Sequence, residues 1–208
     1  MIRIDCEQGS PEWFAARVGI ATASCFSSIL ATIKSGEAAE RRNYRSRLIV
    51  ERLTGKCVDG FKSSAMQQGV EREPLARAAY ESRTRNFVDE VGFLRHDELE
   101  CGASPDGLID DDGGLEIKCP ELSAHLSYLR SEALPAAYVA QVQGCMWITG
   151  RAWWDFVSWN PDFPERLQLV VRRVRRDDKY IAGLGLAVSV FMGEVRAEVE
   201  EINALPLA

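Results

Sequence analysis

The segment formed by residues 104–120 constrains the fold of this chain more than any other. Two short apolar runs flank the sequence Asp-Asp-Asp-Gly-Gly, which is typical of a tight turn between antiparallel strands. Side chains at positions i and i+2 of a strand point to the same face, so Glu116 and Lys118 are expected to emerge together. The turn brings Asp106 back beside Glu116. The segment therefore predicts a β-hairpin that gathers two carboxylates and an ammonium group.

This group of side chains suits metal-dependent chemistry. Asp106, Glu116 and the main-chain carbonyl of Ile117 would form an all-oxygen site, which favours magnesium or manganese over zinc. Lys118 would either position or deprotonate a water molecule, or stabilise charge that builds on a phosphate. An acidic hairpin tip alone is usually a solvated turn, and Glu-x-Lys is a common tripeptide. The order Pro-Asp, about ten residues, then Glu-x-Lys in an apolar strand is more specific, and it favours a nuclease.

The remaining patterns alternate between helix and strand. Helical spacing and capping signals predict helices near residues 10–14, 22–32, 39–53, 63–83 (with Pro74 as an interruption), 136–149 and 177–203. Alternating or β-branched runs predict strands at 86–95, 100–109, 115–119, 153–159 and 167–174. This order predicts a single α/β domain over residues 1–208, in which a central mixed β-sheet is flanked by helices.

Composition places the chain among ordinary globular proteins. It has 208 residues, of which 46% are hydrophobic and 27% charged, enough for one sizeable core. The six cysteines are scattered without a Cys-x-x-Cys pair, so neither a structural zinc site nor a disulfide framework is expected. No apolar run reaches the roughly 18 to 20 residues of a bilayer span, and the N-terminus does not resemble a signal peptide. We therefore expect a cytoplasmic location and no membrane contact.

The charge distribution leaves two interpretations open. The net charge of −6 argues against a nucleic-acid partner, because phosphate binding relies on Lys and Arg. Basic residues nevertheless cluster in two stretches: Lys34, Arg41, Arg42, Arg45, Arg47 and Arg52 form the first, and Arg172, Arg173, Arg175 and Arg176 the second. They would line a DNA channel on an otherwise acidic body. Alternatively, Arg41, Arg42 and Arg45 would form a solvated helix face together with Glu37, Glu40 and Glu51.

Four motifs together resemble the family of lambda exonuclease and the YqaJ-like viral recombinases, within the PD-(D/E)XK nuclease superfamily. They are an N-terminal Trp-Phe-x-x-Arg segment at 13–24, Ser-Pro-Asp-Gly-Leu at 104–108, Leu-Glu-Ile-Lys-Cys-Pro at 115–120, and Ala-Gln-Val-Gln at 140–143. Their order and spacing are compatible with the family, and the resemblance extends from about residue 13 to 180. It implies a restriction-endonuclease-like core.

The resemblance also implies roles for individual residues. Asp106, Glu116 and the Ile117 carbonyl would bind two Mg²⁺ ions, with Mn²⁺ as a substitute. Lys118 would act on the attacking water, and Gln141 would help to orient it. A Gly-x-x-x-Glu motif at 69–73 makes Glu73 a further acidic residue of the site, acting directly or through water, with Glu71 as a neighbour that could be confused with it.

A second set of residues would hold DNA. Arg17 and Ser24 match positions that bind the 5′-phosphate of the degraded strand, with Thr22 assisting, and the planar fork of an arginine matches phosphate oxygens. Lys34 lies roughly where a DNA-contacting arginine is expected. Without the resemblance, we would interpret Arg17 as part of a surface salt bridge and Ser24 as a helix cap.

The implied activity is processive, Mg²⁺-dependent 5′-to-3′ digestion of linear double-stranded DNA, which leaves 3′ overhangs for phage-type recombination. The family implies a ring-shaped homotrimer and a single-strand annealing protein as partner. A PD-(D/E)XK endonuclease, a catalytically inactive DNA-binding protein of the same fold, and a metal enzyme with another substrate are the alternatives. The complete set of Asp106, Glu116 and Lys118 argues against the inactive form.

Overall fold

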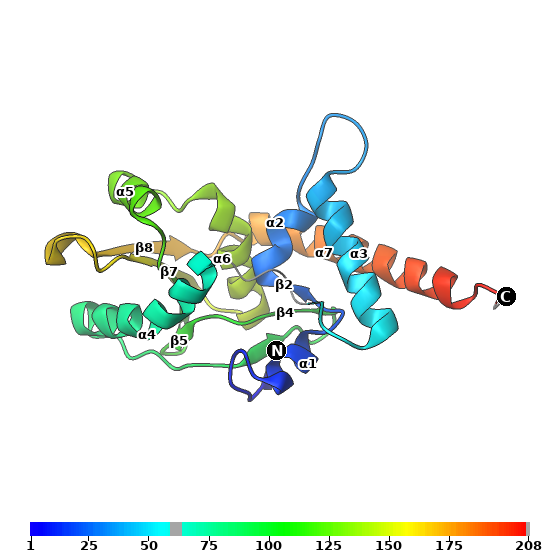
Figure 1. The fold of residues 1–208 in the computed structure, drawn as a ribbon, viewed down its shortest axis with the longest axis horizontal. Coiled ribbons are helices and arrows are strands. Elements are labelled where there is room, and N and C mark those ends of the chain that lie inside the picture. Colours follow the sequence, from blue (N-terminus) through cyan, green and yellow to red (C-terminus); the bar gives the residue numbers. More distant parts are fainter. Residues whose placement is uncertain (59–63, 207–208) are drawn as a thin grey trace.

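The computed structural model describes residues 1–58 and 64–206, with the side chains of residues 64–66 excepted, and shows a mixed α/β fold (Figure 1). Its strands form two four-stranded sheets, and each sheet contains both parallel and antiparallel pairs. The first sheet has the order β1 (Ile2–Ile4), β3 (Phe93–Arg95), β4 (Cys101–Ala103), β2 (Ala21–Thr22). The second has the order β5 (Gly107–Ile109), β6 (Gly113–Lys118), β7 (Trp153–Trp159), β8 (Leu169–Arg175).

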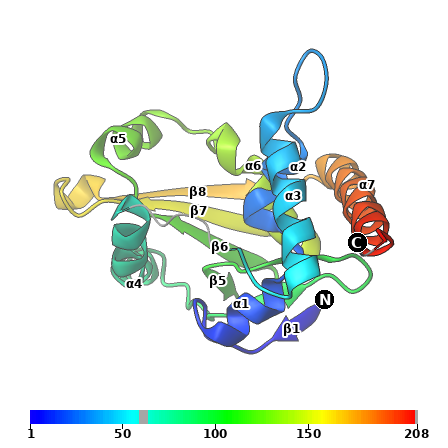
Figure 2. The same ribbon diagram turned by 45° about the vertical axis from the view of Figure 1, so that its right-hand side comes forward.

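Helices enclose the second sheet and one side of the first. They are α1 (Pro11–Arg17), α2 (Phe26–Ile29), α3 (Ala39–Thr54), α4 (Ser64–Thr84), α5 (Leu122–Arg130), α6 (Ala136–Thr149) and α7 (Asp178–Asn203), with short 3₁₀ turns at Ala23–Cys25 and Glu165–Leu167. Helix α4 packs on β6, β7 and β8, and α5 contacts β7. Helices α2, α3 and α7 contact one another and form a separate group at the other end of the molecule (Figure 2).

Local sequence explains where several helices begin and end. The Ser10 hydroxyl accepts a hydrogen bond from the Trp13 amide at 3.2 Å, and Pro11 occupies the first helical position of α1. Helix α3 ends at Gly55, whose φ of +66° favours glycine and whose amide donates to the Glu51 carbonyl at 2.8 Å. Both boundaries agree with the sequence prediction.

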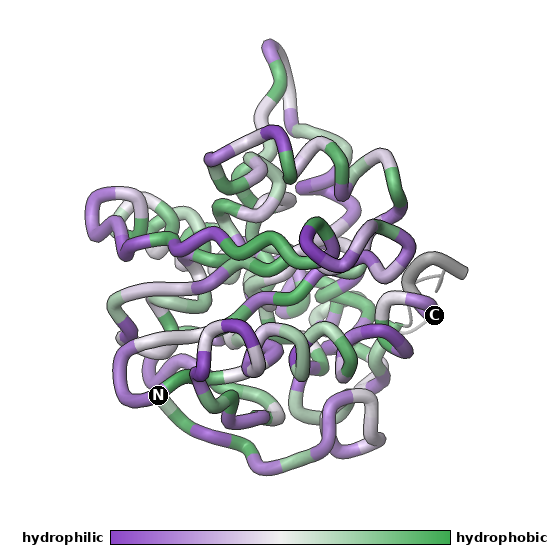
Figure 3. The backbone as a smooth tube through the Cα atoms, turned by 90° about the vertical axis from the view of Figure 1, so that its left-hand side faces the viewer, coloured by the Kyte–Doolittle hydropathy of each residue, from purple (hydrophilic) through white to green (hydrophobic). Residues whose placement is uncertain are grey.

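The core consists of two clusters. One lies between the group of α2, α3, α6 and α7 and the first sheet, and contains Phe26, Leu94 and Phe191. The other lies between α4 and the second sheet, and contains Tyr80 and Leu115. The hydropathy colouring shows hydrophobic segments running through the middle of the molecule (Figure 3). The hairpin that carries Glu116 is therefore fixed from both sides.

The structure differs from the predicted secondary structure in several places. Strand β1 was not predicted, and the predicted helix 22–32 consists of the end of β2, the 3₁₀ turn at Ala23–Cys25 and the short helix α2. The predicted strand 100–109 is two strands in two sheets, because the chain leaves the first sheet after Ala103 and Pro105 offers no amide to a ladder. The predicted strand 86–95 pairs only at Phe93–Arg95, with an isolated bridge at Asp89. The sequence did not predict α5, which begins without a side-chain cap.

Helix α7 meets the length and composition required of a membrane span, contrary to the expectation from the sequence, and it is the one such helix in the part of the chain that the structure describes. Core helices meet the same requirement. Helix α7 buries Ile181, Leu184, Val188, Phe191, Met192 and Val195, and contacts α3 and α6. Packing inside the protein thus accounts for these six residues, whereas Leu186 and Val190 of the same helix are exposed.

Candidate active site

The hairpin brings the predicted carboxylates and the lysine together. Asp106 precedes β5, and its Oδ2 accepts a hydrogen bond from the Ile117 amide at 2.6 Å. Glu116 and Lys118 share a face of β6, and the Lys118 Nζ lies 2.5 Å from the Glu116 Oε1. Lys118 also lies 5.3 Å from the ring centroid of Tyr138. Three groups that are separate in the sequence thus form one cluster at the end of β6.

Helix α6 contributes Gln141 to this cluster. The Gln141 amide donates to the Glu116 Oε1 at 2.6 Å. Gln143 points elsewhere, because residues two positions apart occupy different faces of a helix. Its amide nitrogen donates to the Arg175 carbonyl at 2.9 Å, and its amide oxygen accepts from the Asp177 amide at 3.0 Å. Gln141 therefore lies in the site and Gln143 in the structural framework.

Helix α4 contributes Glu73. This side chain is half-buried and accepts a hydrogen bond from Arg77 at 3.2 Å. Burial raises the pKa of Glu73, and the nearby Glu116 carboxylate raises it further. Glu71 is exposed on the same helix. Of the two glutamates in the Gly-x-x-x-Glu region, Glu73 is thus the one beside the cluster.

The electrostatics of the cluster fit a hard divalent cation. Burial raises the pKa of Asp106 well above its usual value, and the Glu116 carboxylate adds to the shift. Burial lowers the pKa of Lys118, but the carboxylates of Glu116 and Asp106 outweigh burial, and the net pKa lies above its ordinary value. The Glu116 Oε2 is buried without a hydrogen-bond partner among the described residues, and such an oxygen is suited to a metal ligand.

Side chains alone do not complete a metal shell. Within residues 1–58 and 64–206, no three His, Cys, Asp or Glu side chains converge closely enough to hold a metal ion. Asp106 and Glu116 would therefore need further oxygen ligands, which the Ile117 carbonyl and water can supply.

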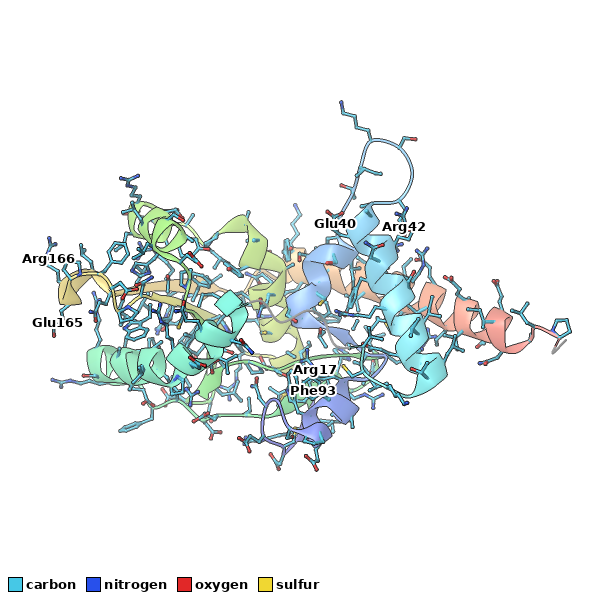
Figure 4. The ribbon with its side chains drawn as sticks, in the orientation of Figure 1. Arg17, Glu40, Arg42, Phe93, Glu165 and Arg166 are labelled. Atoms are coloured by element: carbon cyan, nitrogen blue, oxygen red, sulfur yellow. The ribbon has the colours of Figure 1, made fainter. Side chains whose placement is uncertain are left out.

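The N-terminal residues form a second polar group. The Arg17 guanidinium stacks 3.9 Å over the Trp13 ring and donates to the Ser104 Oγ at 3.0 Å. The Trp13 indole donates to the same oxygen at 2.8 Å. Arg17 also lies near Phe93, 5.8 Å from its ring centroid (Figure 4). Sequence reasoning identified Arg17 but missed Trp13 and Ser104 as its partners, and burial lowers the pKa of Arg17.

Thr22 and Ser24 line a pocket together with Arg17. Their hydroxyl oxygens are 3.4 Å apart, and the Thr22 amide donates to the Tyr44 hydroxyl at 2.9 Å. Tyr44 is buried on α3, so it fixes this part of the chain against the helix. Lys34 is exposed between α2 and α3 and does not line the pocket that contains the other predicted residues.

One pocket of about 870 Å³ joins the two groups. Its lining includes Arg17, Thr22 and Ser24 from the N-terminal group, and Asp106 and Glu73 from the carboxylate cluster. The pocket therefore offers guanidinium, hydroxyl and carboxylate groups to a single ligand.

Most arginines of the two basic stretches have structural partners. Arg41 and Arg45 of α3 pair with Glu37 and with Glu194 of α7. In the second stretch, Arg172 donates to the Ser131 carbonyl, Arg173 pairs with Asp155, and Arg176 donates to the Met146 carbonyl. Arg41 and Arg45 thus pair with Glu37, as the second interpretation predicts, whereas the three arginines of the second stretch contact an aspartate or main-chain carbonyls.

A comparison with protein families decides the classification. Residues 12–152, more than half of the chain, match the YqaJ-like viral recombinase domain. The chain belongs to this family. The match includes Arg17, Asp106, Glu116, Lys118 and Gln141.

Solved structures agree with membership of the YqaJ-like family. The alkaline exonuclease LHK-Exo from Laribacter hongkongensis is 41% identical, with a TM-score of 0.86 over 93% of this chain and 96% of that chain. The complex of LHK-Exo with dAMP gives a TM-score of 0.87 at the same identity and coverage. A phage-related exonuclease from Haemophilus somnus 129PT, with a TM-score of 0.73 and 16% identity over 88% of this chain and 96% of that chain, supports the fold alone.

A shorter relative occurs among curated proteins. The Escherichia coli K12 protein ExoD is 36% identical over 73 residues, which are 35% of this chain and 82% of ExoD. The YqaJ-like family and the alkaline exonucleases together support a nuclease role for the chain.

Proposed function

We propose that this YqaJ-like protein is a Mg²⁺-dependent exonuclease that digests one strand of linear double-stranded DNA from 5′ to 3′ and leaves 3′ overhangs for phage-type recombination. One observation carries the proposal: a single pocket is lined by the Arg17 group and by Asp106 and Glu73. A strand end whose phosphate is held by Arg17 and Ser24 would extend along this pocket toward the carboxylates. Such an arrangement favours cleavage close to a 5′ end.

The chemistry follows from the cluster at the end of β6. Asp106, Glu116 and the Ile117 carbonyl would hold two Mg²⁺ ions, with Glu73 contributing directly or through water and Mn²⁺ as a substitute. Bound metal would lower the pKa of the attacking water and stabilise the leaving oxygen. The Lys118 ammonium, beside Glu116, would act on the same water. The Gln141 amide would restrict the orientation of that water, because its own position is fixed by Glu116.

The oligomeric state, the protein partner and the cellular location are parts of the same proposal, and they rest on family resemblance. A homotrimeric ring around DNA would account for processivity, because an enclosed duplex cannot leave sideways. A ring would also place three basic inner surfaces close together while acidic surfaces face outward, which suits a chain of net charge −6. A single-strand annealing protein would receive the 3′ overhang, in the cytoplasm of a bacterial host that carries the phage or prophage.

A digestion assay with magnesium tests the activity. The substrates are linear duplex DNA with 5′-phosphate ends, the same duplex with 5′-hydroxyl ends, and a covalently closed circle. We expect fast loss of the phosphorylated strand, slower loss of the hydroxyl strand and an intact circle. Lys118→Ala is expected to reduce all cleavage by at least about a hundredfold, because it removes a group that acts in the transition state.

Other outcomes point to the alternatives. A nicked or linearised circle would make the protein an endonuclease. Absence of metal-dependent cleavage on all three substrates would contradict the catalytic proposal and leave a DNA-binding protein of the same fold.

A further inference from the structure

Arg47 is an arginine of the first basic stretch that sits in the pocket. It lies on α3, one turn after Tyr44, and lines the pocket together with Arg17, Thr22 and Ser24. Its guanidinium stacks 4.7 Å from the Tyr44 ring centroid. The same tyrosine hydroxyl accepts the Thr22 amide, so one buried side chain fixes both Arg47 and the Thr22 backbone.

The hydrogen-bonding capacity of Arg47 is largely unused. Its Nη2 donates to the Cys25 Sγ at 3.3 Å, and sulfur is a weak acceptor. Its Nε is buried and has no hydrogen-bond acceptor in the described part of the chain. The Glu51 Oε1 is 3.9 Å away, and the Glu51 carboxylate already accepts the Gly19 amide at 2.9 Å. Among the described residues, this partly buried cation thus has one anionic neighbour, Glu51, which it does not reach at hydrogen-bonding distance.

The other arginines of the two stretches provide a contrast. Six of them reach a carboxylate or a main-chain carbonyl of the protein at hydrogen-bonding distance: Arg41, Arg45, Arg52, Arg172, Arg173 and Arg176. Arg17 and Arg47 differ from them, because their side chains donate to the neutral atoms Ser104 Oγ and Cys25 Sγ. Arg17 and Arg47, whose printed hydrogen bonds in the described part of the chain go to neutral atoms, therefore line the same pocket.

We propose that Arg47 is the second guanidinium of the 5′-phosphate site, and that the pair with Arg17 makes this site selective for a terminal phosphate monoester. A monoester carries about −1.5 to −2 charges at pH 7, whereas an internal phosphodiester carries about −1. The positive charge of two guanidiniums balances the charge of a monoester and exceeds that of a phosphodiester. The inference rests on the proposed exonuclease function, and it adds the residue and the charge count by which a strand end is distinguished from its interior.

Digestion rates measured on two kinds of DNA end test the inference. Initial digestion rates on 5′-phosphate and 5′-hydroxyl duplexes are compared for the wild type, Arg47→Gln, Arg47→Lys and Arg42→Gln. We expect Arg47→Gln to lower the phosphate-to-hydroxyl rate ratio by about tenfold or more, because charge-assisted hydrogen bonds to phosphate are lost. Arg47→Lys should keep part of the ratio, since it retains the charge but not the planar fork.

Arg42 is the matched control. It is exposed on the same helix, does not line the pocket, and lies at the end of α3 remote from Arg17 (Figure 4). Arg42→Gln should leave the ratio at its wild-type value. An equal fall of both rates in Arg47→Gln, with the ratio preserved, would show a merely structural role and overturn the inference. Equal wild-type rates on both ends would also overturn it, while leaving the nuclease function in place.

A binding measurement separates this inference from the proposed activity. Fluorescence anisotropy of labelled duplexes in EDTA compares 5′-phosphate with 5′-hydroxyl ends in the absence of cleavage. A preference for the phosphate end that is lost in Arg47→Gln but retained in Arg42→Gln would support the assignment even if no DNA were digested. Identical wild-type affinities for the two ends would contradict it. Thermal unfolding of each variant checks that the stacking on Tyr44 is not needed for folding.

Discussion

At the scale of single residues, Gly114 shows how closely the sheet is packed. It lies on β6 opposite Trp154 of β7, and a Cβ at this position would overlap the fully buried Trp154 ring. We expect Gly114→Ala to lower the free energy of unfolding by about 2 kcal/mol, because the added Cβ would lie 2.2 Å from a carbon of a ring that is fully buried. Urea denaturation measures this change.

Gly183 is the matched control for this substitution. It is exposed on α7, and an added Cβ would meet no atom within 4 Å in the described structure. Gly183→Ala should raise stability by about 0.5 to 1 kcal/mol, as expected when alanine replaces glycine within a helix. A loss of stability at Gly183 equal to that at Gly114 would contradict the packing argument.

Asp106 connects stability to metal binding. Its carboxylate is crowded by Glu116 in a site shielded from water, which disfavours the charged pair in the absence of a cation. Asp106→Asn keeps an oxygen that can accept the Ile117 amide, and should stabilise the metal-free protein by about 1 kcal/mol. Thermal unfolding with and without MgCl₂ gives the second part of the prediction: Mg²⁺ raises the Tm of the wild type but not of the variant. An equal rise in both proteins would remove Asp106 from the metal site.

At the scale of secondary-structure elements, α4 is attached to the sheet by a buried polar contact. The Tyr80 hydroxyl donates to the Asp155 Oδ2 at 2.6 Å, and Arg173 donates to both oxygens of this carboxylate at 2.9 and 2.8 Å. Burial raises the pKa of Tyr80 to about 12, and the hydrogen bond to Asp155 is the second cause of this rise. The hydroxyl therefore stays protonated and acts as the donor. Because Glu73 lies on the same helix, this contact also determines where Glu73 meets the cluster.

Tyr80→Phe tests this attachment. Loss of the hydroxyl leaves a buried carboxylate with one partner fewer, so the free energy of unfolding should fall by about 1 to 3 kcal/mol. Tyr180→Phe, on the half-buried Tyr180 of α7, is the control and should stay within about 0.5 kcal/mol of the wild type. Denaturant titration of both variants provides the comparison, and equal losses would refute a special role for the Tyr80 contact.

Elements also show what the sequence could and could not predict. Helix α1 and the end of α3 follow from Ser10, Pro11 and Gly55, because caps and turns are local signals. Helix α5 was missed because its stabilisation is tertiary: Arg172 of β8 donates to the carbonyls of Tyr128 and Ser131 at its end. No signal within residues 120–131 indicates that contact.

The candidate site also contains residues that the sequence could predict and residues that it could not. Asp106, Glu116 and Lys118 were predictable, since strand alternation and one turn bring them together. The Trp13, Arg17 and Ser104 group was not, because it forms only when α1 packs beside the end of β4. Contacts between segments about 90 residues apart leave no local periodicity in a sequence.

At the scale of the whole molecule, the proposed homotrimer is the prediction to test. Sedimentation velocity should give a mass three times that of one chain, and addition of linear duplex DNA should shift this species as a unit. Processive digestion should appear as fully degraded strands beside intact ones when DNA exceeds enzyme. A monomer that digests processively would show that another device holds the DNA.

The pairing of several arginines within the protein affects how it first meets DNA. Five arginines contact carboxylates or carbonyls of their own chain: Arg41, Arg45, Arg172, Arg173 and Arg176. The net charge of the chain is −6. From a distance, therefore, a duplex approaches a body of like charge, and only at close range does it meet the cationic part of the pocket. Modest salt should screen this long-range repulsion and speed the first encounter, whereas salt slows the encounter for nucleases with a positive surface. Diffusive capture of a DNA end would then limit the start of digestion and leave the later steps of the same run unaffected.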